Sequence, residues 1–147
     1  MEVEVCFEKD RSKPKIVIYT GEMTQEIIEL VKRLTEVSGQ ILVGYKNDEV
    51  ILLRLEDIYR IYAQDQKVLA QTQKEVVKIK MRLYELEEKL GGTRMIRISN
   101  SEIVNFDKVK SLDLSISGTI SIKFDTGEKS FVSRRYVEKI KKHIGIN

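Results

Sequence analysis

The sequence has few of the residues on which many kinds of protein chemistry depend. Its 147 residues include one cysteine, one proline, one histidine and no tryptophan. The single cysteine, Cys6, cannot form a disulfide within the chain and suits a reducing compartment. A single histidine, His143, far from that cysteine in the sequence, cannot complete a zinc site with it. We therefore expect neither a disulfide scaffold nor a metal centre.

Long hydrophobic runs and catalytic motifs are also missing. No apolar run approaches the ~18 residues that a membrane-spanning helix needs, and the acidic, alternating start "MEVEVCFEKD" does not resemble a signal peptide. The sequence contains no glycine-rich phosphate loop and no G-x-S-x-G motif, and one histidine cannot serve a Ser-His-Asp triad. These absences predict a cytoplasmic protein that is not an enzyme and that needs no cofactor.

The composition is that of a folded protein, with an uneven distribution of charge. Hydrophobic residues make up 41% of the chain and charged residues 33%, which is enough to bury a core. Residues 91–147 contain 11 Lys and Arg against 6 Asp and Glu, a net charge of +5, whereas residues 1–90 carry a net charge of −2. The basic C-terminal third favours a polyanionic partner. A solvated lysine-rich surface would explain the same charge.

The first forty residues predict a small β-β-α unit. The segments 3–7 ("VEVCF") and 15–20 ("KIVIYT") have the character of strands, and residues 21–39 predict a helix. The apolar residues of this helix recur at helical spacing: Met23, Ile27, Val31 and Leu34. Such a unit buries too little surface to fold alone, so it must pack on the rest of the chain or on a second copy.

The periodicity changes near Gly39-Gln40, which we take as the boundary of a second domain, residues 41–147. This domain contains many short strands separated by turn sequences such as Asn47-Asp48 and Asp65-Gln66. Helical patterns occur only at 81–90 and at 134–145. The expected fold is therefore mainly β with short helices, preceded by the N-terminal β-β-α unit.

Three polar segments fall at the ends of expected strands. They are Gln64–Lys67, Arg97–Ser101, which we expect to lead into a brief helical turn, and Ser133–Arg135. Lysine and arginine bind phosphate, arginine can grip guanine with two donors, and asparagine or glutamine can pair with the edge of adenine. Their shared position in strand-end loops favours binding of nucleic acid.

Each segment also has an ordinary structural explanation. Capping of a following helical turn would by itself explain the Ser99-Asn100-Ser101 sequence. The pair Arg134-Arg135 can be surface charge, and Lys67 can protect an exposed sheet edge from aggregation.

Four elements in this order resemble the LytTR family of bacterial DNA-binding domains. They are "LEDIYRIYAQDQKVLAQT", "LYELEEKL", "RMIRISNSEIVNFDKVKSLD" and "FVSRRYVEKIKK". The most specific parts are the R-x-x-N-S…V-N pattern from Arg97 to Asn105 and the run V-S-R-R-Y-V-x-K-I at residues 132–140. The resemblance covers roughly residues 45–146.

The resemblance implies a mostly β fold whose loops enter successive major grooves of duplex DNA. By position it assigns base contacts to Lys67, Asn100 and Arg135, and flanking phosphate contacts to Ser99 and Arg134. Relatives often have histidine at the first of these positions, where this chain has Lys67 or a neighbouring glutamine. We expect Arg97 and Asn105 to be structural: the arginine to brace the corner, and the asparagine to tie backbone groups together.

The resemblance also implies partners. LytTR sites are usually paired repeats, so we expect double-stranded DNA and a homodimer, with residues 1–40 as the dimerisation element. The alternative is that these residues only pack against their own DNA-binding domain. They are too short for a receiver domain and lack its acidic cluster, so the resemblance is to stand-alone LytTR regulators, which a small membrane protein often restrains. A competing function is a protein-interaction module whose basic face binds an acidic partner.

Overall fold

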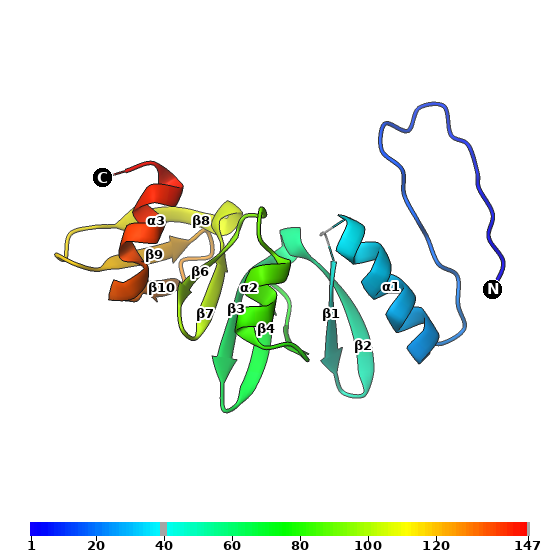
Figure 1. The fold of residues 1–147 in the computed structure, drawn as a ribbon, viewed down its shortest axis with the longest axis horizontal. Helices are drawn as coiled ribbons and strands as arrows, with labels where there is room; N and C mark the ends of the chain where they lie inside the picture. The colour runs from blue at the N-terminus through cyan, green and yellow to red at the C-terminus, as the bar shows by residue number, and fades with distance from the viewer. Residues whose placement is uncertain (39–40, 147) are drawn as a thin grey trace.

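The computed structural model describes residues 1–38 and 41–146, and within them the fold is mainly β, as expected (Figure 1). A seven-stranded sheet has the order β2-β1-β5-β4-β3-β7-β6, and a three-stranded sheet has the order β10-β9-β8. The strands of the large sheet are β1 (Ile41–Lys46), β2 (Glu49–Arg54), β3 (Ile58–Gln64), β4 (Lys67–Thr72), β5 (Val76–Ile79), β6 (Met95–Ser99) and β7 (Glu102–Asn105). Those of the small sheet are β8 (Val109–Asp113), β9 (Ile120–Phe124) and β10 (Lys129–Val132).

The helices are short and lie apart from one another along the chain. The α-helices are α1 (Gln25–Ser38), α2 (Leu83–Lys89) and α3 (Val137–Ile144), and the 3-10 turns are η1 (Leu55–Asp57), η2 (Phe106–Lys108) and η3 (Arg134–Tyr136). Among the described residues no helix has the length and apolar character required to cross a membrane.

The two predicted hairpins form, and each turn contains two consecutive left-handed residues. Asn47 and Asp48 join β1 to β2 with φ of 49° and 63°, and Asp65 and Gln66 join β3 to β4 with φ of 51° and 62°. Two consecutive left-handed residues define the tight turn whose twist matches that of the flanking strands. The turn therefore fixes the register that places Lys67 opposite Gln64.

Two hydrophobic clusters hold the strands in place. The first lies between the large sheet and α2, and includes Ile61, Ile103 and Leu86, none of which is accessible to solvent. The second packs β3, β6 and β7 against the small sheet and α3, and contains Tyr59, Ile98, Val104, Phe106, Ile120, Ile122, Phe124, Val132, Val137 and Ile140. Strands β3, β6 and β7 each contribute side chains to both clusters. The polar turns at the ends of these strands are therefore held by a packed framework.

The N-terminal strands were predicted wrongly. Residues 1–24 contain no strand, and Val3 and Phe7 are 87% and 95% exposed. An alternating sequence becomes a strand only where a neighbouring strand accepts its backbone hydrogen bonds, and this segment runs apart from both sheets (Figure 1). The expected helix does form, with the hydroxyl of Thr24 accepting a bond from the Ile27 amide at 3.3 Å. The boundary predicted at Gly39-Gln40 lies outside the described residues.

The polar corner at residues 99–101 also differs from expectation. It leads into β7 and not into a helical turn, because Asn100 and Ser101 form the turn of the β6–β7 hairpin. The helical turn, η2, comes only after Asn105. Neither turn residue has a positive φ, so the bend requires no glycine.

Candidate nucleic-acid interface

The three polar segments lie next to one another along one edge of the molecule. The amide of Ala63, near the tip of the β3–β4 hairpin, donates to the carbonyl of Ser101 at 2.8 Å. On the other side of the β6–β7 turn, the Tyr136 hydroxyl donates to Oδ1 of Asn100 at 3.5 Å. In Figure 1 the tips of both hairpins and the N-terminal end of α3 point to the same side. Segments 70 residues apart in the sequence therefore form one continuous row of turns.

The guanidinium of Arg97 holds the shape of the β6–β7 turn from inside. Its Nε donates to the carbonyl of Ser99 at 3.0 Å and its Nη2 to the carbonyl of Asn100 at 2.7 Å. Its Nη1 lies 3.4 Å from a carboxylate oxygen of Glu87 on α2, and the Arg97 side chain is only 14% exposed. The prediction that this arginine braces the corner is confirmed, and the base of the turn is tied to α2, which packs on the large sheet.

Asn105 has the structural role expected of it. The residue is buried, and its Nδ2 donates to the carbonyls of Leu55 and Ile58 at 3.2 and 2.9 Å. Its Oδ1 accepts from the amide of Asp107 at 3.0 Å and so begins η2. One side-chain amide thereby joins the β2–β3 connection to the start of η2.

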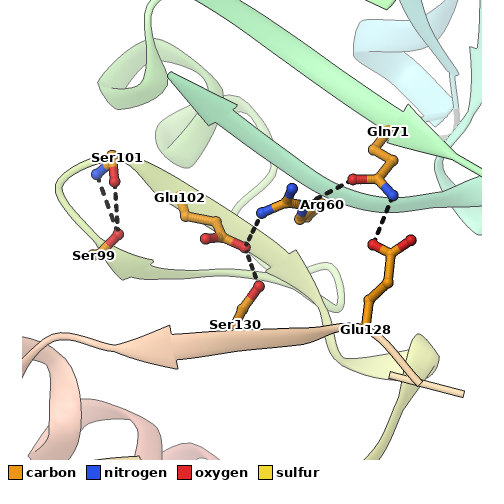
Figure 2. A network of polar contacts seen from close by, with 7 residues as sticks. All are labelled: Arg60, Gln71, Ser99, Ser101, Glu102, Glu128 and Ser130. Atoms are coloured by element: carbon orange, nitrogen blue, oxygen red, sulfur yellow. Dashed lines mark hydrogen bonds and ion pairs between the residues drawn. The ribbon is translucent and has the colours of Figure 1, made fainter. Parts of the chain in front are cut away.

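The side chains expected to contact DNA differ in accessibility. Lys67, Asn100, Arg134 and Arg135 are exposed on the row of turns. Ser99 is half-buried, and its Oγ accepts from the Ser101 amide at 3.2 Å and lies 3.3 Å from the Ser101 hydroxyl (Figure 2). The structure thus brings all five residues to one edge, but the hydroxyl of Ser99 is already bonded to Ser101 within the turn.

Two further residues of this edge were not found from the sequence. Tyr136 joins η3 to the β6–β7 turn, and Glu102 begins β7 directly after that turn. The tyrosine stood inside a recognised motif but gave no sign of its contact with Asn100, 36 residues earlier. A carboxylate among basic turns was not a candidate for binding a polyanion.

Candidate metal ligands do not gather in this structure. In the part of the chain that it describes, no three His, Cys, Asp or Glu side chains are placed to hold a metal ion. His143 is exposed near the end of α3, with its ring 5.5 Å from that of Phe106.

These features define a β domain that presents polar turns along one edge. The family model for the LytTr DNA-binding domain matches residues 48–145. The chain therefore belongs to the LytTR family of DNA-binding domains.

Known proteins agree with this assignment. An uncharacterised HTH-type transcriptional regulator of Staphylococcus aureus (strain bovine RF122 / ET3-1) is 29% identical over 147 residues, with 99% of each chain covered. The corresponding regulator of strain NCTC 8325 / PS 47 has the same identity and coverage. A solved LytTr DNA-binding domain, from a Bacillus cereus protein described as a methyl-accepting/DNA response regulator, superposes with a TM-score of 0.69 at 24% identity. The superposed region covers 73% of this chain and 98% of the solved chain, and the similarity supports the fold.

Proposed function

We propose that the protein is a sequence-specific transcriptional regulator that inserts its strand-end turns into successive major grooves of duplex DNA. The observation that carries this proposal is the row of three adjacent turns with Lys67, Asn100 and Arg135 exposed on it. A rigid row of turns can follow a groove as a recognition helix does, because hydrogen-bond donors and acceptors on side chains read base edges whatever backbone carries them.

The chemistry of each residue suits a particular contact. The amide of Asn100 can bond to both the N6 and N7 positions of adenine, and the guanidinium of Arg135 to O6 and N7 of guanine. Lys67 can reach guanine or a phosphate. Arg134 and the turn at Ser99 are placed to meet phosphates beside the bases. The relatives are named as helix-turn-helix regulators, but strands separate the helices of this chain, so we assign recognition to the turns.

Selection of bound sites from random duplex DNA tests the proposal. We expect wild-type protein to enrich a motif of paired repeats, and Asn100→Ala and Arg135→Ala to relax that motif at different base positions. Each substitution should weaken binding of the enriched duplex by ~1–3 kcal/mol. The matched control is Arg54→Ala, which should leave the motif unchanged. Arg54 is an exposed arginine at the end of β2, which forms the other edge of the large sheet from β6. Binding at low salt without any enriched motif would instead favour the protein-interaction module with an acidic partner.

We further propose that the regulator is a homodimer and that residues 1–20 make the contact between the two copies. Phe7 and Tyr19 are 95% and 94% exposed, and β2 is an edge strand of the large sheet with Leu52 42% exposed. Exposed apolar segments of this kind mark association surfaces. The helix of the N-terminal unit is not available for this purpose, because its residues Ile27 and Val31 are buried within its own chain.

The dimer proposal predicts a change in sedimentation. Val3→Asp with Phe7→Asp should convert a dimer into a monomer in sedimentation velocity, since each charge would be placed in an apolar contact. Tyr84→Asp, at a 60% exposed site on α2, should leave the dimer intact. A wild-type monomer, or a dimer that persists in the doubly substituted protein, would contradict the assignment.

The proposed function also places the protein in the cytoplasm with its DNA. The resemblance to stand-alone LytTR regulators favours a small membrane protein as its inhibitor. Recovery of the regulator in the soluble fraction of its host, regardless of which membrane proteins are produced with it, would contradict that partner.

A further inference from the structure

Glu102 occupies the junction between the three turns. It is the first residue of β7, directly after the turn at residues 99–101, and its side chain is 13% exposed. Its Oε2 accepts a hydrogen bond from the Ser130 hydroxyl at 2.5 Å and lies 3.4 Å from Nη1 of Arg60 (Figure 2). One carboxylate oxygen therefore contacts both a buried hydroxyl and a partly buried cation.

Each of these contacts lies on a strand that leads to a different turn. Arg60 is on β3, which runs to the hairpin tip before Lys67. Ser130 is on β10, which runs to Ser133 and η3. The carboxylate on β7 thus joins the strands that carry all three polar turns, across the junction of the large and small sheets.

A second contact reinforces this junction. Nε of Arg60 donates to Oε1 of Gln71 on β4 at 2.8 Å, and Nε2 of Gln71 donates to a carboxylate oxygen of Glu128, next to β10, at 2.9 Å (Figure 2). The network therefore crosses between the sheets twice. Polar networks of this kind have a narrow range of satisfied geometries, so they fix the relative placement of the elements that they join.

The charge of Glu102 is unfavourable at this edge if it has no other role. A carboxylate near the proposed phosphate contacts repels the DNA backbone and lowers affinity for any sequence. Its position can be explained by geometry: the three turns must keep fixed spacings if each is to meet its own base at the same time.

We propose that Glu102 is a positioning residue for DNA recognition, which sets the spacing of the three turns through Ser130 and Arg60. This inference rests on the proposed function. It makes a prediction opposite in sign to that of simple electrostatics. Loss of the carboxylate charge lowers affinity for the specific site while affinity for other DNA stays the same or rises.

The test compares Glu102→Gln and Ser130→Ala with wild-type protein. The probes are the duplex enriched by wild type and a scrambled duplex of equal length. For Glu102→Gln we expect about a tenfold loss of affinity for the enriched duplex and no loss for the scrambled one, because the coupling of a partly buried charged pair is of this order. Ser130→Ala, which changes no charge, should give a smaller loss of the same kind. The double variant should bind about as well as Glu102→Gln, since both act through one contact.

A matched control and the pattern of specificity decide the outcome. Glu138→Gln removes an exposed carboxylate from the first turn of α3 and should not weaken binding to either duplex. Repeated selection with Glu102→Gln should relax the motif at the positions of more than one turn. Unchanged specific affinity and an unchanged motif would overturn the inference, as would equal gains on both duplexes. If wild type enriches no motif, the proposed function itself fails. Thermal melting confirms that each variant is folded, and Ser130→Ala decides the matter if Glu102→Gln is not.

Discussion

Replacing Asn105 with alanine is expected to lower the free energy of unfolding by about 2–4 kcal/mol, because it removes three hydrogen bonds to the backbone from a buried position. The side-chain amide serves the carbonyls of Leu55 and Ile58 and the amide of Asp107. Alanine can replace none of these bonds, and the buried position keeps water from replacing them all.

Urea or guanidinium denaturation measures this effect, and the chain offers a control of the same chemistry. Asn100→Ala removes an exposed asparagine and should change the free energy of unfolding by less than about 0.5 kcal/mol. The two asparagines are five residues apart and should therefore separate into a stabilising residue and a recognition residue. Similar stability losses in both variants would show that Asn105 has no special structural role.

Replacing Arg97 with methionine is expected to weaken binding of the enriched duplex by about 10- to 100-fold, because the recognition turn would lose its internal support. The carbonyls of Ser99 and Asn100 both accept from this guanidinium. Methionine fills similar space but donates nothing, so the turn would sample other shapes and would have to be ordered again on binding. Both carbonyls lie at an exposed or partly exposed turn where water can replace the lost donors, so the stability loss should stay near ~1 kcal/mol.

Arg94→Met is the matched control for this experiment. Arg94 pairs with Asp107 at 3.0 Å in an exposed ion pair, with side chains 56% and 64% exposed, and its loss should matter little for stability. Each substitution removes one positive charge, Arg97 within β6 and Arg94 directly before it. If the two variants lost affinity for the enriched duplex equally, charge and not the shape of the turn would be responsible.

Local sequence signals were sufficient wherever the conformation depends on neighbours in the chain. The pairs Asn47-Asp48 and Asp65-Gln66 predicted hairpins, because asparagine and aspartate tolerate the left-handed conformation that tight hairpin turns require. Gln66, which also has a positive φ, carries no such signal. The apolar spacing of Leu83, Leu86 and Leu90 predicted α2, whose side chains pack on the large sheet. The LytTR resemblance supplied the fold that these local signals could not assemble.

The failures occurred where distant partners decide the outcome. Residues 3–7 alternate as a strand does, but the described structure gives them no neighbouring strand. The Ser99-Asn100-Ser101 sequence is equally suited to a helix cap and to a hairpin turn, and pairing with β6 decides for the hairpin. The bond between Glu102 and Ser130 joins residues 28 positions apart. No periodicity or motif marks such a contact, because it depends on how two sheets meet.

The support of the β6–β7 turn by main-chain acceptors has an evolutionary consequence. Arg97 bonds to the carbonyls of residues 99 and 100, and carbonyls are present whatever side chains those residues carry. Duplicated copies of such a gene could therefore exchange the side chain at residue 100 and acquire new target sites without first rebuilding the turn. Specificity would diverge by single substitutions on an inherited scaffold, and a family of regulators with separate targets could arise without passing through unfolded intermediates.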